Sequence, residues 1–417
     1  MNLASLRNNN MIFLGILAAL MAVNSLATDV YLPAMPVMSE MLGPGAELTI
    51  SGYLFGFMIA QLVWGPISDR IGRIKPLIMG SVLFVIGTIG CAMATSMTSL
   101  VIWRVFQAVG ACVGPMLSRA MIRDRYSVTD AADKLSLITM VMAVAPIVGP
   151  SMGGFIVTFA PWQTIFWVVA VIGILIGVAV LALPETWPEE RRRKDGILNA
   201  FKVYGELMKD TAFMKYTLVV AFFYMAAYAI IAGTPFVYIT YYGIPEIYYG
   251  SLFAANVIGV IIASFFNRRL VRRYTLDTLL RASTAIALIG AVVLLVLIGT
   301  NWLGVAGVIA SVIVIFGTNG IIAACATAAA LNMAGRKAGT AAALIGSLQY
   351  GSGIVSSIGL AVFANGTPWP MGIITLVSLI ICAYLAWTNK QSEPVATEVE
   401  VNHADEEVDG MAVDSAR

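Results

Sequence analysis

The chain has 417 residues, of which 59 % are hydrophobic and 12 % are charged. A soluble domain has about 45–50 % apolar and about 25 % charged residues, so a soluble globule of this length could not bury so much apolar surface, and we predict an integral membrane protein. The formal net charge of +2 combines an acidic segment after residue 390 with an excess of Lys and Arg before it. In membrane proteins such an excess marks cytoplasmic loops, so nucleic acid is not an expected partner.

Apolar stretches recur along the chain, each near the ~20 residues that a helix needs to cross ~30 Å of hydrocarbon. They do not alternate as the strands of a membrane barrel do, so we expect an all-α fold whose surface faces the lipid bilayer. The twelve predicted spans are 11–33, 47–68, 76–95, 99–122, 135–158, 163–183, 215–237, 247–266, 277–298, 303–326, 339–363 and 369–388.

The connectors between these spans alternate in charge. Those after the odd-numbered spans contain no Lys or Arg, whereas those after spans 2, 4, 6, 8 and 10 all contain several basic residues. Under the positive-inside rule this pattern places both termini in the cytoplasm. The sequence thus predicts a multi-pass protein of the bacterial inner (cytoplasmic) membrane.

The longest and most polar connector, 184–214, divides the chain into two six-span halves, 1–183 and 215–390. Spans 1 and 7 begin near 11 and 215, and spans 5 and 11 near 135 and 339, so the same separation recurs. We therefore expect two pseudo-symmetric six-helix bundles, an arrangement that usually encloses a site near the midplane. The acidic tail, 391–417, has few large apolar residues and is expected to be disordered.

Five short stretches carry a family resemblance. They are 65–73 (GPISDRIGR), 104–110 (RVFQAVG), 149–154 (GPSMGG), 27–36 (ATDVYLPAMP) and 119–124 (RAMIRD). The first two resemble the loop between helices 2 and 3 and the helix-4 arginine motif of the major facilitator superfamily, and the third resembles the helix-5 motif of its proton-driven drug exporters. The last two resemble its Bcr/CflA branch, the bicyclomycin and chloramphenicol resistance exporters. The resemblance implies a twelve-span drug/proton antiporter that works by alternating access.

The same resemblance implies roles for two groups of residues. The conformational latch comprises Gly65, Asp69, Arg70, Gly72 and Arg73. Its Asp69 is expected to face the start of helix 11, near Gly339 and Thr340, where the helix dipole favours an anion. The helix-5 group comprises Gly149, Pro150, Gly153 and Gly154, and is expected to lie against the other half and resist leakage. Positive-inside topology for the bases and ordinary helix packing for the glycines are the alternatives.

Charged residues inside the spans and away from their ends are Asp29, Arg104 and Arg119. A charge there costs at least ~2.5–3.5 kcal/mol, so each is expected to face the interior and find a partner. If the protein is proton-coupled, Asp29 is the leading group to carry the proton. Depth favours Arg104 as its partner, because both lie roughly 6–8 Å below the outer edge. Arg119 lies about 22 Å further inward and more plausibly anchors the cytoplasmic end of its helix. A structural ion pair is the alternative reading of these charges.

Candidate substrate-binding residues are aromatic, amide or basic side chains within spans, because an apolar pocket with a few polar groups is the usual small-molecule site. They are Tyr31, Tyr53, Phe57, Gln61, Arg119, Tyr224, Tyr228, Phe236, Asn256, Asn319 and Gln349. Each aromatic side chain could equally face lipid or the helix core. The charge count favours small, neutral or weakly polar antibiotics as substrates.

Other functional classes find little support. No nucleotide-binding loop is present, so the proton gradient, and no cofactor, is the expected energy source. The four cysteines lie in apolar stretches and the one histidine, His403, lies in the tail, so we expect neither a metal site nor an intramembrane enzyme. A membrane anchor or sensor would need a folded soluble domain, which the short connectors do not supply. The remaining alternative is a facilitator or proton-coupled transporter of a small metabolite. We expect a monomer.

Overall fold

The computed structural model describes residues 10–192, 198–271 and 273–388. Within these ranges the regular elements are helical, and twelve helices are long and apolar enough to cross a membrane. This confirms the predicted all-α membrane fold and its number of spans. The acidic tail, for which the sequence predicts disorder, lies outside the described residues.

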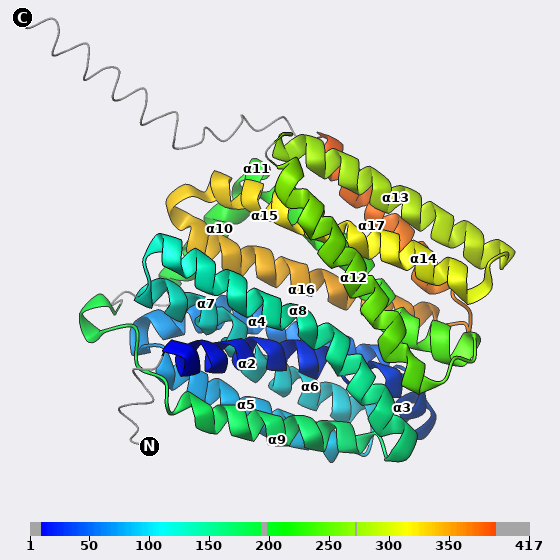
Figure 1. Cartoon of the computed structure of the whole chain (residues 1–417), viewed down its shortest axis with the longest axis horizontal. Helices are drawn as coiled ribbons and strands as arrows, with labels where there is room; N and C mark the ends of the chain where they lie inside the picture. Colours follow the sequence, from blue (N-terminus) through cyan, green and yellow to red (C-terminus); the bar gives the residue numbers. More distant parts are fainter. Residues whose placement is uncertain (1–9, 193–197, 272, 389–417) are drawn as a thin grey trace, which may run out of the picture.

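Spans one to six come from the first half of the chain, and two of them consist of consecutive helices (Figure 1). The elements are α2 (Asn10–Asp29), η1 (Leu32–Ala34), α3 (Met35–Leu42), α4 (Glu47–Ile71), α5 (Ile74–Ala92), α6 (Met97–Ala111), α7 (Val113–Arg125), α8 (Val128–Phe159) and α9 (Gln163–Val180).

Spans seven to twelve come from the second half, after a connector that contains η2 (Glu189–Arg191) and α10 (Leu198–Lys209). The elements are α11 (Thr211–Pro235), the π-helix η3 (Phe236–Tyr241), α12 (Glu246–Leu270), α13 (Leu276–Thr300), α14 (Gly304–Gly317), α15 (Asn319–Ala334), η4 (Gly335–Lys337), α16 (Ala338–Phe363) and α17 (Trp369–Thr388).

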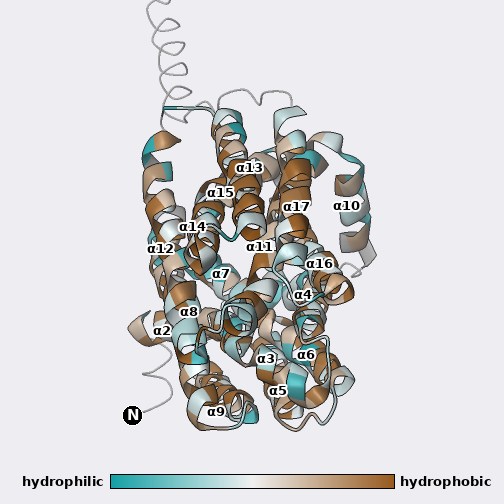
Figure 2. Ribbon diagram, turned by 90° about the vertical axis from the view of Figure 1, so that its right-hand side faces the viewer, coloured by the Kyte–Doolittle hydropathy of each residue, from teal (hydrophilic) through white to brown (hydrophobic). Residues whose placement is uncertain are grey.

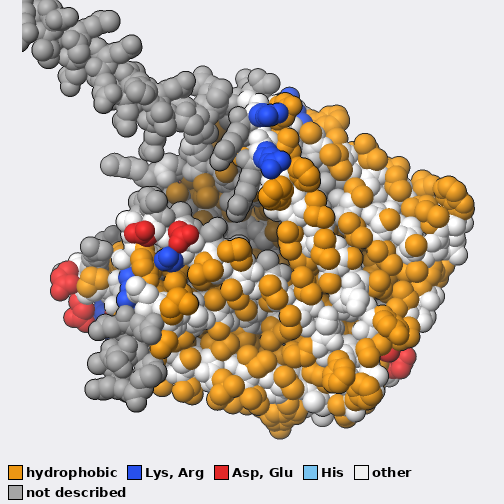
Figure 3. Space-filling model, in the orientation of Figure 1, with side chains coloured by type: hydrophobic (Ala, Val, Ile, Leu, Met, Phe, Trp, Pro, Cys, Tyr) orange, Lys and Arg blue, Asp and Glu red, His pale blue; other side chains and the backbone are white. Residues whose placement is uncertain are grey.

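The helices run side by side along the long axis of the molecule (Figure 1). One end of the bundle carries α10 and the connector Asp69–Arg73, and we call it the linker end. The opposite end carries α3 and η3, and we call it the α3 end. In Figure 2 the hydrophobic colour dominates the spans. In Figure 3 hydrophobic side chains cover most of the visible face, and most of the visible charged side chains lie toward the linker end, with an acidic group at the α3 end.

Two predicted spans are interrupted at equivalent places. The predicted span 99–122 is formed by α6 and α7, which meet at Cys112, and the predicted span 303–326 by α14 and α15, which meet at Thr318. Thr318 follows Cys112 by 206 residues, close to the separation of the predicted span starts. Hydrophobic patterning does not reveal such an interruption, but its recurrence is consistent with a repeat.

The first and seventh spans extend beyond their predicted limits. After α2 the chain continues through η1 and α3 to Leu42, and after α11 it continues through η3 to Tyr241. Pro33 and Pro36 interrupt the first extension, but each lies at the first turn of a new helix, where proline is tolerated because its missing N–H has no partner there.

The two halves touch mainly along two helix pairs, α4 with α16 and α8 with α12 (Figure 1). Glycines allow this close approach. A Cβ at Gly353 of α16 would collide with the side chains of Leu54 and Tyr228, and one at Gly250 of α12 would collide with the backbone of Ser151 in α8. Small residues at such crossings let backbones pack closely in a membrane, where no hydrophobic effect draws helices together.

Candidate functional site

The interior of the first half encloses the guanidinium of Arg104, whose side chain is fully buried. Its Nη1 donates hydrogen bonds to the backbone oxygen of Ala27 at 2.9 Å and to Oε1 of Gln107 at 2.6 Å. Gln107 in turn donates from Nε2 to Oγ1 of Thr88 at 2.9 Å, which fixes the orientation of its amide. Nε and Nη2 of Arg104 have no hydrogen-bond partner among the described residues.

Two tyrosine rings cover the same guanidinium. Its central carbon lies 4.2 Å from the ring centroid of Tyr31 and 4.4 Å from that of Tyr53. A cation over a ring face is stabilised by about 2 kcal/mol when the pair is desolvated. Thr49 donates a hydrogen bond to the hydroxyl of Tyr31 at 3.1 Å, and the hydroxyl of Tyr53 donates to Oδ1 of Asn24 at 2.8 Å. These bonds hold the rings in place around Arg104.

Asp29 lies at the end of α2 and is buried, with 7 % of its surface exposed. Among the described residues no ion pair or hydrogen bond joins it to Arg104, so the expected direct pair is not formed. The charge of Arg104 still acts on it through space, since Arg104 is anchored to the carbonyl of Ala27, two residues away. Asp29 therefore lies near a positive charge, but no hydrogen bond or ion pair with that charge holds its carboxyl group in the ionised form.

Helix α8 packs directly behind Asp29. A Cβ at Gly149 would lie 3.4 Å from the Cβ of Asp29, and one at Gly153 would collide with the backbone oxygen of Val30. A Cβ at Gly154 would instead collide with the backbone oxygen of Glu246, at the start of α12 in the other half. The helix-5 group, with Pro150 inside the helix, thus touches both the Asp29 segment and the second half.

A cavity of about 300 Å³ lies between the halves, on the linker side of these residues. It extends from Asn24 and Phe57 to the connector at Asp69 and Arg73, and α16 forms its opposite wall. Three of the predicted substrate-binding residues, Phe57, Gln61 and Arg119, line it. The remaining lining residues are Gly65, Ser68, Cys112, Pro115, Met116, Leu117, Ala120, Arg123, Met142, Gly339, Ala342, Ala343 and Tyr350.

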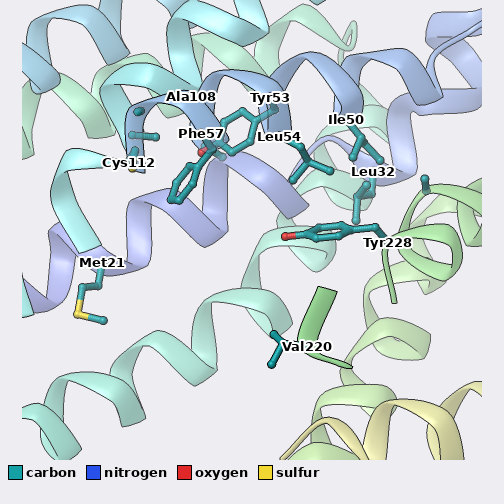
Figure 4. Close-up of a cluster of buried hydrophobic side chains, with 14 of the residues drawn as sticks. Met21, Leu32, Ile50, Tyr53, Leu54, Phe57, Ala108, Cys112, Val220 and Tyr228 are labelled. Atoms are coloured by element: carbon teal, nitrogen blue, oxygen red, sulfur yellow. The ribbon is translucent and has the colours of Figure 1, made fainter. Parts of the chain in front are cut away.

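Aromatic side chains from both halves meet at the inner end of this cavity. The ring centroids of Phe57 and Tyr350 are 4.1 Å apart, those of Tyr350 and Tyr228 are 6.3 Å apart, and those of Tyr228 and Tyr224 are 6.1 Å apart. Figure 4 shows Tyr228 reaching from the second half toward Leu54 of α4. Sequence reasoning missed Tyr350, although its position on α16, one residue after the predicted Gln349, was a usable signal.

The other predicted substrate-binding residues lie elsewhere. Tyr31 and Tyr53 are buried around Arg104, and Phe236 lines a second cavity, of about 120 Å³, at the α3 end. Asn256 is buried in α12, and its Oδ1 has no hydrogen-bond partner among the described residues. Asn319 begins α15, and Gln349 is half-buried in α16; neither is among the residues that line the larger cavity.

The second cavity shows that Asp29 is not the only buried carboxylate in the spans. Glu47, the first residue of α4, is 8 % exposed and lines this cavity together with residues of the second half. Asp277, in the first turn of α13, is 2 % exposed and accepts a hydrogen bond from the hydroxyl of Tyr216 at 2.7 Å. Both lie at predicted span ends, so the sequence placed them at the membrane surface. The signal in the sequence for Glu47 was an acidic residue beside a connector that contains no Lys or Arg.

The predicted latch residues form a network at the linker end. Arg73, which is 5 % exposed, donates to Oδ1 of Asp69 at 2.7 Å and to Oδ2 of Asp124 at 2.9 Å. The carboxylate of Glu185 accepts hydrogen bonds from the backbone amides of Arg73 and Ile74 at 2.8 and 3.2 Å. The network ties the connector Asp69–Arg73 to α7 of the first half and to the start of the long connector 184–214.

Gly72 is required at this connector. Its φ of +93° is a left-handed conformation that favours glycine, and a Cβ there would collide with the carboxylate of Glu185. Arg70 is exposed, and Gly65 lines the cavity. The expected contact between Asp69 and the start of α16 is not formed: among the described residues no hydrogen bond or ion pair joins them, although Asp69 and Gly339 line the same cavity.

Helix α10 touches both halves at the linker end. The hydroxyl of Tyr204 donates to the backbone oxygen of Leu62 in α4 at 3.3 Å, and burial raises the pKa of this phenol to about 12, so it stays protonated. Glu206 pairs with Lys337, at the start of α16, at 2.6 Å. This hydrogen bond holds the pKa of Glu206 below its usual value, so the pair persists at neutral pH and is lost as the pH falls.

The chain belongs to the Major Facilitator Superfamily, whose family model matches residues 17–357, and it is therefore a transporter and not an enzyme. It is 35 % identical over 374 residues to the uncharacterized MFS-type transporter YdgK of Bacillus subtilis (strain 168), with 88 % of this chain and 92 % of that protein covered. It is 30 % identical over 388 residues to a bicyclomycin resistance protein homolog of Haemophilus influenzae, with 91 % and 96 % covered. Its fold is similar to that of the xylose transporter XylE from E. coli, with a TM-score of 0.71, 13 % identity, and 93 % and 99 % of the two chains covered.

Proposed function

We propose that this transporter exports small, neutral or weakly polar antibiotics across the bacterial inner membrane in exchange for protons. The observation that carries the proposal is the position of Asp29, a buried carboxylate that lies against Gly149 of α8, the helix that also contacts the second half. Similarity to a bicyclomycin resistance protein homolog supports the class of substrate. Both termini and the linker end are cytoplasmic in this proposal, and the protein acts as a monomer of two six-helix halves.

Alternating access connects Asp29 to transport. At the α3 end the halves meet where Gly154 faces the backbone of Glu246, whereas the larger cavity separates them toward the linker end. A substrate enters this cavity from the cytoplasm and lies against Phe57, Tyr228 and Tyr350. Rocking of the halves then closes the linker end and parts α8 from α12. Because burying an ionised carboxylate is costly unless it is paired, a change in the exposure of Asp29 changes its affinity for a proton.

Closure of the linker end is where the latch acts. Asp69 and Gly339 line the cavity from opposite halves. When the cavity closes, the carboxylate of Asp69 meets the N-terminus of α16, where an anion is stabilised by ~0.3–1 kcal/mol at an exposed site and up to ~2 kcal/mol when partly buried. Arg73 holds Asp69 in position until then. The latch therefore favours the state that opens outward.

A susceptibility panel tests the proposal. The protein is expressed in a host that lacks its own exporters, and growth is measured with amphenicol-type and bicyclomycin-type antibiotics, with and without a protonophore. We expect resistance to at least one of these drugs, and we expect drug accumulation to rise to the level of the empty host when the protonophore is added. Resistance that survives the protonophore, or accumulation of drug that is faster with the protein than without it, would instead indicate facilitated diffusion or import.

A further inference from the structure

The charges that line the larger cavity do not balance. Its charged residues are Asp69, Arg73, Arg119 and Arg123. Asp69 is paired with Arg73, which also pairs with Asp124 behind the wall. Arg119 and Arg123 make no hydrogen bond or ion pair with any described residue, so the uncompensated charges of the lining are positive.

Arg119 is the better placed of the two for binding a ligand. Its side chain is exposed to the cavity, which Tyr350 of the opposite half also lines. A cation in a cleft with apolar walls has its field focused into the cleft, which attracts anions and repels cations.

The aromatic rings supply the other part of a binding site. The ring centroids of Phe57 of α4 and Tyr350 of α16 are 4.1 Å apart, with the rings tilted by 36°, and both side chains line the same cavity as Arg119. A flat ring lying against these side chains would place a substituent toward the guanidinium. Guanidinium binds carboxylate, sulfonate or phosphate groups in a bidentate geometry that a neutral group cannot match.

We propose that Arg119 is a specificity-determining residue that selects small aromatic monoanions, whose ring packs against Phe57 and Tyr350 and whose acidic group binds the guanidinium. This inference rests on the proposed export function: it keeps the direction of transport and the proton coupling, but assigns substrates with one negative charge in place of the neutral compounds named above. The positive lining disfavours organic cations in the same cavity. Arg119 binds the substrate directly and takes no part in carrying the proton, which is the role of Asp29.

Binding of matched probes tests the proposal without transport. The purified full chain in nanodiscs of zwitterionic lipid is titrated with 2-naphthoate and with 2-naphthamide, which have the same ring but differ in charge. We expect 2-naphthoate to bind at least about tenfold more tightly, as charge-assisted hydrogen bonds of ~1.5–3 kcal/mol imply. Arg119→Gln should remove this preference and leave the affinity for 2-naphthamide unchanged, whereas Arg119→Lys should retain part of it. Tyr350→Leu should weaken the binding of both probes.

Arg269→Gln is the control, because it changes the net charge equally but lies on α12, away from the residues that line the cavity. It should leave both affinities within about twofold. A wild-type protein without preference for 2-naphthoate, or a preference that survives Arg119→Gln, would overturn the proposal. So would displacement of 2-naphthoate by inorganic phosphate at matched ionic strength, which would indicate a general anion patch. The measurement needs no proton gradient, so failure of proton coupling would leave its result unchanged.

Discussion

The side chain of Arg104 is fixed by several contacts, whereas that of Asp29 has no ion pair among the described residues. We propose different roles for the two residues on this basis. Arg104 is fully buried between two tyrosine rings and makes hydrogen bonds to a backbone oxygen and to Gln107, so its charge has a fixed environment. Asp29 has no ion pair among the described residues, and it adjoins a helix that contacts the other half. Adding a proton to Asp29 or removing one therefore breaks no ion pair. In the proposed mechanism, Arg104 therefore supplies a constant field and Asp29 exchanges the proton.

Asp29→Asn tests this division. The substitution preserves the shape of the side chain, so the variant should fold and still bind drug, but it should not move drug against a gradient. Drug-induced proton release, measured for the purified protein between about pH 6 and pH 9, should disappear. Asp277→Asn is the matched control, because Asp277 is also buried but is bonded to Tyr216 at the linker end of α13. It should keep proton release. Unchanged release from Asp29→Asn would remove Asp29 from the mechanism.

Glu47 makes a second prediction at the scale of a single residue. At the α3 end its carboxylate is buried among residues of the second half, and among the described residues it forms no hydrogen bond or ion pair with another side chain. Burying an unpaired charge is costly. Glu47→Gln should therefore stabilise the contact between the halves at this end, raise the melting temperature of the protein in detergent, and slow the maleimide labelling of a cysteine introduced at Thr367 several-fold.

The labelling experiment has a low background and a close control. The four native cysteines are buried, so they should react slowly. Glu40→Gln removes an acid from the same end of the molecule, but Glu40 is exposed on α3 and should leave the labelling rate unchanged. Faster labelling in the Glu47→Gln variant would mean that the carboxylate holds the halves together instead of pushing them apart.

At the scale of elements, α8 and α12 form the contact that must open for release at the α3 end in the proposed export cycle. Gly154 of α8 lies against the backbone of Glu246, and Gly250 of α12 lies against the backbone of Ser151, so each helix presents a glycine to the other. Gly149, one turn away in α8, has ordinary van der Waals space around it. The closure of the α3 end therefore depends on two glycines whose neighbours are backbone atoms that cannot move aside.

Alanine substitutions test the role of each of these glycines. Gly154→Ala and Gly250→Ala should each push α8 and α12 apart, at a cost of about 1–3 kcal/mol for overpacking. Each should shift the protein toward the state open at the α3 end and reduce transport about five- to 150-fold, as that cost implies. Gly15→Ala on α2, where a Cβ would meet no atom within 4 Å, should leave transport within about twofold. Labelling of the cysteine introduced at Thr367 reports the shift, and equal rates in all three variants would contradict a closure made by these glycines.

The sequence predicts a helix where its position depends only on the length of an apolar run. The twelve spans follow from apolar runs, but the interruption at Cys112 and the extension to Leu42 do not, because an apolar run shows neither where the backbone hydrogen bonding of a helix is broken nor whether the chain resumes a helix after Pro33 and Pro36. The site was predicted in part. Single charges such as Asp29 and Arg104 stand out against apolar neighbours, whereas the rings that cover Arg104 and the burial of Glu47 depend on packing between distant segments.

At the scale of the whole molecule, α10 bridges the halves at the linker end. Tyr204 bonds to the backbone of α4, and Glu206 pairs with Lys337 beside α16. The two helices it reaches are the pair that form opposite walls of the larger cavity. A linker tied to both walls restrains how far they separate, while the cavity between them leaves room for closure. The segment 184–214 thus connects the two halves through side-chain contacts as well as through the chain itself.

Orientation in the membrane is the last prediction, and it rests on charge. The connectors after odd-numbered spans contain no Lys or Arg, and those after even-numbered spans up to the tenth are basic, so the positive-inside rule puts the linker end in the cytoplasm. Reporter domains fused within 184–214 or within 391–417 should be active as cytoplasmic fusions, and one fused near Gly366 should be active only as a periplasmic fusion. Fusions to alkaline phosphatase and to green fluorescent protein read the two sides independently. Two inverted reporters would reverse the proposed direction of entry, because the larger cavity would then open to the periplasm.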